Sequence, residues 1–248
     1  MEKNTTPSLR KDLEAYQNRK AYLLDENRPE AIAKRHTKGF RSARENIADL
    51  CDKDGFLETG SLIVAGQRGR KTEEELYQQT PADGLITGLA SVNGHLFTEE
   101  ASKCFVLSYD YTVLAGTQGG FNHKKTDRVL QQAHQAQKPV IFFVEGGGGR
   151  PGDVDFTPIT VGGLDLHTWV HYSRLSGKVA RIAIVNGYCF AGNAAIAGCA
   201  DVIIATKSTS LGMGGPAMIA GGGLGNFHPK AIGPAGVQAA NGVIDILV

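Results

Sequence analysis

Apolar residues in the first third of the chain are spaced singly among charged, helix-forming residues. This pattern fills residues 9–24 and 28–50 and predicts helices in both segments. Ser42 and Glu45 stand three residues apart, which is the spacing of a capping box at a helix start. We therefore expect an exposed helical segment that packs one face against the rest of the protein.

From about residue 84 the pattern changes to short apolar runs that alternate with helix-length segments. The runs predict strands at 85–94, 104–109, 140–144, 179–185 and 202–205, the first two as a hairpin-like pair. One helix is predicted to start at Thr126 or Asp127 and to end before Pro139. Two others are predicted at 164–175 and at about 192–200. This order favours an α/β protein with stacked sheets, followed from residue 211 by a glycine-rich, loop-heavy tail.

Charge and glycine content divide the chain at the same point. Residues 1–80 hold 15 of the 26 Lys and Arg residues and 14 of the 25 Asp and Glu residues, but only 5 of the 32 glycines. We therefore expect a charged helical extension at residues 1–83, which ends in an exposed polar loop at 66–84. A packed α/β domain should occupy residues 84–248.

The overall composition argues against several classes of protein. The 248 residues carry a formal net charge of +1, which disfavours general nucleic-acid binding. No stretch approaches 18 apolar residues, and the first residues lack the apolar core of a signal peptide, so neither a membrane span nor export is expected. The four cysteines show no C-x-x-C spacing and three lie in apolar runs, which favours buried thiols in a reducing compartment. We expect a cytoplasmic protein.

Two apolar runs end abruptly in glycine-rich segments. Glu145-Gly-Gly-Gly-Gly149 follows the run 139–144, and residues 186–193 follow the run 179–185. Glycine tolerates a positive φ and lets a ligand approach bare backbone, so N–H groups in such segments can be aimed at an anion. Loops of this kind are also common as tight turns. We predict that the two segments converge and supply N–H donors to one developing oxyanion.

Known phosphate-binding loops do not account for these glycines. Residues 146–149 lack the G-x-G-x-x-G spacing, and no acidic residue lies suitably about 20 residues further on. The sequence G-x-x-x-x-G-K-[ST] does not occur. We therefore expect neither a dinucleotide site nor a direct ATP site.

Acidic and histidine residues near these segments have both a functional and a structural interpretation. Glu145 and Asp153 could form an acid–base pair, but a surface salt bridge that includes Arg150 is favoured. His167 and His171 lie four residues apart on an expected helix and could bind a metal. Because no H-E-x-x-H motif or third ligand accompanies them, an exposed helix face is favoured.

Basic residues and one cysteine admit the same two interpretations. The group Lys34-Arg35-His36 with Lys38 could contact phosphates, although a solvated helix face is favoured. Lys124 and Lys125 precede an expected helix start, where either could reach a phosphate or remain an ordinary surface residue. Cys189 has no positioned histidine or cationic neighbour that would make it a nucleophile.

Six segments of the sequence match known motifs in a fixed order. Residues 41–58 are similar to "TARERI…LLD…SFxE", and 88–94 to a first sheet strand. Residues 111–119 with Lys125 are similar to "TVxGGS…K", 145–150 to "DSGGAR", 187–193 to "GPCAGGA", and 213–216 to a later "GP" turn. Together these segments resemble the biotin-dependent acyl-CoA carboxyltransferases of the acetyl- and propionyl-CoA carboxylase type. The sequence departs from the family at Pro151, after the first glycine segment, and we count one extra residue before Ala191.

The resemblance implies the N-terminal half of a carboxyltransferase β-type chain, with an α/β crotonase-like (ClpP/crotonase) ββα spiral after an N-terminal helical extension. Members of that family transfer CO₂ from carboxybiotin to the α-carbon of an acyl-CoA through an enolate. The implied partners are acyl-CoA, a biotin carboxyl carrier, a biotin carboxylase and the C-terminal carboxyltransferase half, in a homo-oligomer. No tightly bound cofactor is implied.

Enolate formation requires stabilisation of a negative oxygen, and backbone N–H groups in a dry site suit this task. The resemblance assigns one oxyanion site to the N–H groups of Gly148 and Gly149, and the other to those of Ala191 and Gly192. Tentative contacts with the CoA ester are Gly147, Arg150, Lys125 and Gly187. No metal ligands are predicted.

Two other functions remain open from the sequence. A biotin-dependent CoA-ester decarboxylase subunit would use the same fold and oxyanion sites, and a non-catalytic half would bind CoA or support assembly without turnover. The chain ends in the apolar segment Val243-Ile-Asp-Ile-Leu-Val248, which looks like a strand cut short. We therefore expect a fragment of a longer protein, or one half of a split one, and expect it to be inactive alone.

Overall fold

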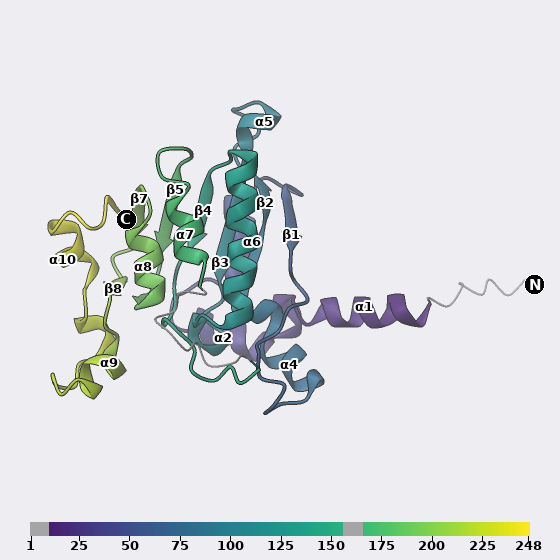
Figure 1. Ribbon diagram of the computed structural model, residues 1–248, viewed down its shortest axis with the longest axis horizontal. Helices are drawn as coiled ribbons and strands as arrows, with labels where there is room; N and C mark the ends of the chain where they lie inside the picture. Colours follow the sequence, from purple (N-terminus) through teal and green to yellow (C-terminus); the bar gives the residue numbers. More distant parts are fainter. Residues whose placement is uncertain (1–9, 156–165) are drawn as a thin grey trace, which may run out of the picture.

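The computed structural model describes residues 10–155 and 166–248. A seven-stranded sheet forms its centre in the order β1-β2-β3-β4-β5-β7-β9, and β6 and β8 form a separate two-stranded sheet (Figure 1). The strands of the large sheet are β1 (Phe56–Thr59), β2 (Leu85–Ser91), β3 (Lys103–Tyr109), β4 (Val140–Phe143), β5 (Arg181–Val185), β7 (Val202–Ala205) and β9 (Ile246–Leu247). Those of the small sheet are β6 (Tyr188–Phe190) and β8 (Ser210–Gly212).

The large sheet combines antiparallel and parallel pairing. β1, β2 and β3 pair antiparallel, whereas β3, β4, β5, β7 and β9 pair parallel. Because β4 and β5 are parallel neighbours, the segments that follow them leave the sheet at the same edge. Both glycine-rich segments begin at this edge.

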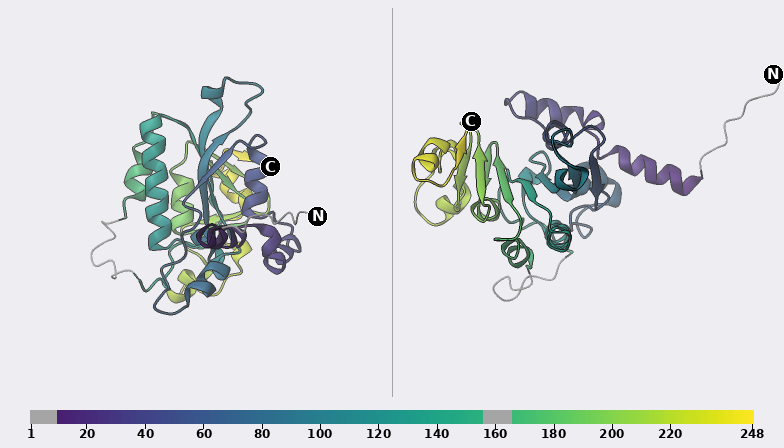
Figure 2. Two further views of the ribbon diagram at one scale, coloured as in Figure 1. Left: turned by 90° about the vertical axis from the view of Figure 1, so that its right-hand side faces the viewer. Right: turned by 90° about the horizontal axis from the view of Figure 1, so that it is seen from above.

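Helices cover the two faces of the sheet and bury separate cores. α6 (Gly120–Ala136), α7 (Thr168–Ser173) and α8 (Gly192–Gly198) lie over one face, and α3 (Ala43–Leu50) lies over the other (Figure 2). Side chains alternate between faces along a strand. Leu107 of β3 accordingly packs in the core beneath α6, while its neighbour Val106 packs in the core that Ile47 of α3 completes.

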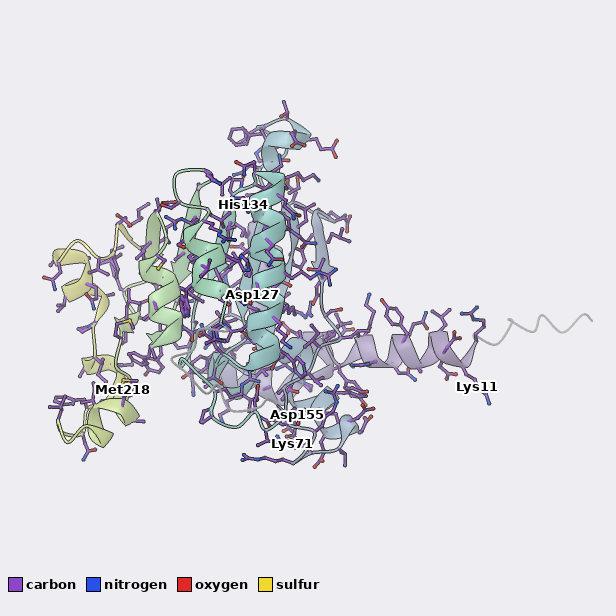
Figure 3. The ribbon with its side chains drawn as sticks, in the orientation of Figure 1. Lys11, Lys71, Asp127, His134, Asp155 and Met218 are labelled. Carbon is purple, nitrogen blue, oxygen red and sulfur yellow. The ribbon has the colours of Figure 1, made fainter. Side chains whose placement is uncertain are left out.

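The other helices are short. They are α1 (Lys11–Ala21), α2 (Pro29–His36), α4 (Glu73–Gln79), α5 (Glu99–Ser102), α9 (Pro216–Gly221) and α10 (Ala235–Ala240), with 3₁₀ turns η1 (Asp25–Asn27), η2 (Pro81–Gly84), η3 (Leu114–Gly116) and η4 (Pro229–Ala231). α1 buries none of its residues. Lys11 at its start and Met218 of α9 lie at opposite ends of the molecule (Figure 3).

The pattern of apolar runs predicted most of the central sheet. The strand predicted at 202–205 is β7 without change, and β2, β3, β4 and β5 lie within one or two residues of prediction at most ends. The helix predicted from Thr126 or Asp127 is α6, which begins at Gly120, six residues before Thr126. The sequence pattern missed this start because the first turns of α6 are polar and carry no apolar stripe. α7 is shorter than predicted, and residues 164–165 of that prediction lie outside the described residues.

Two predictions for the first third of the chain are wrong. Residues 66–84 are not an exposed loop, because α4 and the buried turn η2 occupy most of them. The sheet also begins before residue 84, since β1 pairs with β2 along Phe56–Thr59. The predicted capping box is confirmed: the Ser42 hydroxyl accepts from the Glu45 N–H over 3.0 Å, and the Glu45 carboxylate accepts from the Ser42 N–H over 2.7 Å.

Within the described part of the chain, no helix combines the length and apolar character that crossing a lipid bilayer requires.

Candidate active site

The two glycine-rich segments lie directly against each other. The first runs from the end of β4 through Gly149, and the second passes through β6 into α8. The Gly146 N–H donates to the Tyr188 carbonyl over 2.8 Å, and the Phe190 N–H donates to the Gly146 carbonyl over 2.9 Å. These two bonds join the segments as a short parallel bridge, so the predicted convergence of the two loops is confirmed.

Asn193 holds the same two segments together through its side chain. Its Oδ1 accepts from the Gly148 N–H over 2.9 Å, and its Nδ2 donates to the Gly116 carbonyl over 3.2 Å. The side chain is fully buried. A Cβ at Gly146 would overlap this amide, so the close approach requires glycine there. Sequence reasoning missed Asn193, because an Asn in the first turn of a helix is an ordinary residue.

The hydrogen bonds correct the list of candidate oxyanion donors. The Gly148 N–H is already bound by Asn193, and the Ala191 N–H donates to the Gly212 carbonyl over 3.1 Å. Neither group is therefore available to an oxyanion. The N–H groups of Gly149 and Gly192 have no hydrogen-bond partner among residues 10–155 and 166–248. We retain these two as candidate donors.

The backbone is strained where the second segment meets the first. Ala191 has φ 51° and ψ −121°, a combination that residues with a Cβ seldom adopt. Gly148 has φ 88°, and a Cβ on it would come within 2.5 Å of the Ala191 Cβ and 3.4 Å of the Gly192 nitrogen. A Cβ at Gly192 would in turn overlap the Gln118 amide. Strain of this kind is concentrated at functional sites.

Arg150, a predicted contact of the CoA ester, is instead buried in an ion-pair network. Its Nη1 lies 2.6 Å from Asp83 Oδ1 and 3.3 Å from Asp153 Oδ1, and its Nη2 donates to the Thr117 carbonyl over 2.8 Å. Burial raises the pKa of Asp83 to about 6, although Arg150 opposes the shift. The salt bridge expected between Arg150 and Asp153 is present, but it lies inside the protein rather than on its surface.

Glu145 pairs with Arg35 of α2, a partner that the sequence did not indicate. The contact is bidentate, with Arg35 Nη1 2.8 Å from Glu145 Oε1 and Nη2 bound to Oε2. Burial raises the pKa of Glu145 to about 7, against the opposing effect of Arg35. Gly187 has φ 120°, and a Cβ there would overlap the Glu145 carboxylate. Gly187 therefore makes room for this ion pair, which is a structural reason for the glycine.

Lys125 is buried and its ammonium group points into the protein. It donates to the Leu85 carbonyl and, over 3.2 Å, to the Ala82 carbonyl. Burial lowers the pKa of Lys125 to about 8. Because these carbonyls hold the ammonium group, Lys125 does not face a ligand, and we do not retain it as a phosphate contact. Gly147 is exposed beside the loop contact and stays a predicted contact of the CoA ester.

A groove of 480 Å³ opens next to the first glycine segment. It is lined by residues of α2, by the start of the two glycine-rich segments and by aromatic side chains: Glu30, Ala31, Lys34, Arg35, Lys38, Phe40, Tyr111, Thr112, Glu145 and Tyr188. Arg35 is neutralised by Glu145. Lys34 and Lys38 are exposed, and neither is within ion-pair distance of a carboxylate of the described residues. The groove therefore combines two exposed lysines and the exposed Glu30 with the faces of aromatic rings.

His167 and His171 lie near each other on one side of α7. The rings of His167 and His171 lie 6.0 Å apart between centroids, and His171 Nε2 is 2.8 Å from the Gln131 amide nitrogen. No group of three or more His, Cys, Asp or Glu side chains suited to a metal occurs in the described residues. His123 is buried, and its Nδ1 is 2.9 Å from the Thr168 hydroxyl.

Comparison with known protein families gives one consistent match. The model of the carboxyl transferase domain family matches residues 34–244. The methylmalonyl-CoA carboxyltransferase 12S subunit of Propionibacterium freudenreichii subsp. shermanii is 29% identical over 193 residues, covering 76% of this chain and 33% of that protein. The biotin-dependent long chain acyl-coenzyme A carboxylase beta4 subunit of Mycobacterium tuberculosis is 31% identical over 162 residues, covering 65% of this chain and 27% of that protein. The chain thus spans about a third of the length of these relatives.

Two solved structures have a similar fold. A single-chain, multi-domain long-chain acyl-CoA carboxylase superposes with a TM-score of 0.91 at 53% identity, covering 98% of this chain and 24% of that one. The transcarboxylase 12S structure with hydrolysed methylmalonyl-CoA bound superposes with a TM-score of 0.73 at 24% identity, covering 98% and 46% of the two chains. These neighbours have the crotonase-like fold, so the predicted fold class is confirmed.

Proposed function

Because the chain belongs to the carboxyl transferase domain family, we propose that it is the half of a biotin-dependent acyl-CoA carboxylase that holds the acyl-CoA during CO₂ transfer. The observation that carries the proposal is the contact between the two glycine-rich segments. Gly149 and Gly192, whose N–H groups have no partner within the described residues, each lie against Gln118, which supports the proposal. Such preorganised donors stabilise charge that develops during a reaction.

The chemistry requires a carbanion at the α-carbon of the thioester. Loss of the α-proton places negative charge on the thioester oxygen, and hydrogen bonds from the two N–H groups would stabilise that enolate. The family resemblance assigns the α-proton to the biotin ureido group after the N–CO₂ bond of carboxybiotin has broken, so no protein base is required. The α-carbon of the enolate then forms a bond to the carbon of the released CO₂.

The groove beside α2 suits the nucleotide end of the CoA ester. Lys34 and Lys38 provide positive charge at its edge, and Tyr111 and Tyr188 provide ring faces, with their centroids 6.5 Å apart. Its floor contains Glu145, which directly precedes the first glycine segment. An extended ligand could therefore place its phosphates near α2 and its thioester near Gly149.

The remaining components are proposals drawn from the family. We infer that a biotin carboxyl carrier and a biotin carboxylase supply carboxybiotin, that a C-terminal carboxyltransferase half completes the site, and that the assembly is a cytoplasmic homo-oligomer. A long-chain acyl-CoA is the first substrate to test, because the solved structure at 53% identity is a long-chain acyl-CoA carboxylase.

A CoA-ester decarboxylase is the second candidate. A malonate decarboxylase hetero-dimer superposes with a TM-score of 0.63 at 17% identity, which is a likeness of fold alone. The same two N–H donors would serve an enolate formed by loss of CO₂. The higher identity to a carboxylase favours CO₂ transfer to the acyl-CoA.

The test is a CO₂-transfer assay with the complete protein, its biotin carrier and its biotin carboxylase. With labelled bicarbonate and ATP, we expect label in the α-carboxyl group of an acyl-CoA, compared across acetyl-, propionyl- and palmitoyl-CoA. A complete system that carboxylates its biotin but labels none of these esters would refute the proposal. Release of CO₂ from malonyl-CoA without net carboxylation would favour the decarboxylase.

A further inference from the structure

The first glycine segment has no side chains of its own to hold it in place. Four consecutive glycines, residues 146–149, have a large backbone entropy in the unfolded chain and many accessible conformations. The residues on either side are charged and buried: Glu145 precedes the segment, and Arg150 follows it. Each makes an ion pair with a residue from the first 84 residues of the chain.

The first ion pair fixes the start of the segment. The side chains of Arg35 and Glu145 are only 8% and 10% exposed. The contact uses both terminal nitrogens of the guanidinium group and both carboxylate oxygens. Arg35 is itself fixed, because its Nε donates to the Arg41 carbonyl over 3.0 Å and its guanidinium lies over the rings of Phe40 and Tyr111. The position of Glu145 is therefore set by α2 and the loop after it.

The second ion pair fixes the end of the segment. The side chains of Arg150 and Asp83 are 4% and 0% exposed, and Nη1 lies 2.6 Å from Oδ1. The same guanidinium donates to the Thr117 carbonyl, and the Arg150 N–H donates to the Gln118 carbonyl over 2.7 Å. The backbone just after Gly149 is thus held on both its main chain and its side chain.

We propose that Arg35–Glu145 and Arg150–Asp83 are positioning pairs that together set the direction of the Gly149 N–H. They act through the loop and do not contact the substrate. The proposal rests on the proposed function, since it concerns the donor to the enolate oxygen. It assigns to α2 and η2, which belong to the N-terminal third, a role in the efficiency of the reaction.

A buried ion pair is weak evidence for a contribution to stability, because the cost of desolvating both charges offsets their attraction. Replacing both members with well-packed hydrophobic side chains of similar volume is often neutral for stability. This property separates a positioning role from a structural one. The informative change is therefore the double variant Arg35→Met with Glu145→Met, which removes both charges at once.

The experiment measures kcat and KM for acyl-CoA in the complete enzyme, together with hydrogen–deuterium exchange of the peptide that covers residues 144–150. In the double variant we expect kcat to fall about 10- to 100-fold, because small misplacement of a catalytic group has effects of this size. KM should change less than about threefold, since the basic Lys34 and Lys38 remain. Exchange at the Gly148 amide, which Asn193 protects in the wild type, should become faster.

Arg35→Lys is the second variant, because it keeps the positive charge but loses the bidentate contact with Glu145. It should lose less of kcat than the double variant, and it decides the question if the double variant does not fold. Arg10→Gln is the matched control, because Arg10 pairs with Asp12 on the surface, with side chains 81% and 71% exposed. The control should keep wild-type kcat and wild-type exchange.

Two outcomes would overturn the proposal. One is a folded double variant with kcat within about twofold of wild type and unchanged exchange at residues 144–150. The other is an Arg35→Lys variant that behaves as the Arg10→Gln control when the double variant does not fold. If the wild-type enzyme transfers no CO₂, the proposed function fails instead, and exchange at residues 144–150 still tests the positioning pairs.

Discussion

The side-chain oxygen of Asn193 accepts the N–H of Gly148, so one buried amide closes the contact between the two glycine-rich segments. The other end of that amide donates to the Gly116 carbonyl. A single side chain thereby holds two stretches of backbone, 45 and 77 residues before it in the sequence, against its own helix.

Asn193→Ala should destabilise the protein and slow the reaction. The substitution leaves the Gly148 N–H and the Gly116 carbonyl buried without a partner, and two lost hydrogen bonds of this kind cost about 2 kcal/mol in total. Thermal and urea unfolding measure the loss, and the assay should show a lower kcat. Asn241→Ala, at an exposed helix end, is the control. Equal stability of the two variants would contradict the role given to Asn193.

Gly149→Pro should abolish most of the turnover, because proline has no N–H to donate. Loss of one oxyanion donor typically lowers kcat by about 100- to 1000-fold. The preceding Gly148 tolerates the restriction that proline imposes on its neighbour.

Gly149→Ala is the matched control for that change, since it keeps the N–H and its Cβ would meet no atom within 4 Å. Steady-state kinetics of the complete enzyme should show near wild-type kcat for Ala and a large loss for Pro. Similar kinetics for both variants, with both folded, would remove Gly149 from the site.

The parts of this structure that depend on local pattern could be predicted from the sequence, and the parts that depend on distant partners could not. The β-branched run at Val202–Ala205 and the glycines after Phe143 are local signals, and they gave β7 and the first loop. β1 was missed because a four-residue edge strand such as Phe56–Thr59 has too few residues to show a pattern. The glycines at the ends of two apolar runs predicted that the two loops converge on an oxyanion, and the family resemblance added the enolate reaction.

Which N–H groups remain available is a tertiary property. Gly148 and Gly149 look alike in the sequence, but Asn193 binds only the first of them. The charge of Arg150 suggested a ligand contact, whereas its partner Asp83 lies 67 residues earlier in the chain. Lys125 likewise turns inward to carbonyls that lie 40 and 43 residues before it. Contacts between residues so far apart leave no local pattern from which they could be predicted.

Turnover should fall in acid as Asp83 takes up a proton. Burial raises its pKa from 3.8 to about 6, and the groups that act on it are Arg150, Asp153 and Lys125. Below about pH 6 the carboxyl becomes neutral and its ion pair with Arg150 weakens, so kcat should decline between about pH 7 and pH 5.

Protonation of Asp83 does not unfold the protein, so unfolding does not explain the decline in kcat. Because the folded pKa is above the ordinary value, the folded protein holds the proton between about pH 4 and pH 6. Protonation of Asp83 therefore raises the free energy of unfolding as the pH falls through this window. The pH profile of kcat for Asp83→Asn should lack the step near pH 6 and keep only the step near pH 7 that Glu145 contributes, whereas the exposed Asp49→Asn should keep both steps. An Asp83→Asn profile identical to wild type would contradict the assignment.

Neutralising the two lysines of the groove should weaken binding of the CoA ester without affecting the chemical step. Lys34→Gln with Lys38→Gln removes two positive charges that have no carboxylate partner in the described residues. If they contact the phosphates of CoA, KM should rise about 10-fold and kcat should stay near wild type, with the difference shrinking at high salt. The corresponding pantetheine thioester lacks the nucleotide, so its KM should be the same for the wild type and for the Lys34→Gln, Lys38→Gln variant. Lys53→Gln, an exposed lysine away from the groove, should leave both substrates unaffected. A rise in KM that is as large for the pantetheine ester as for the CoA ester would place the nucleotide elsewhere.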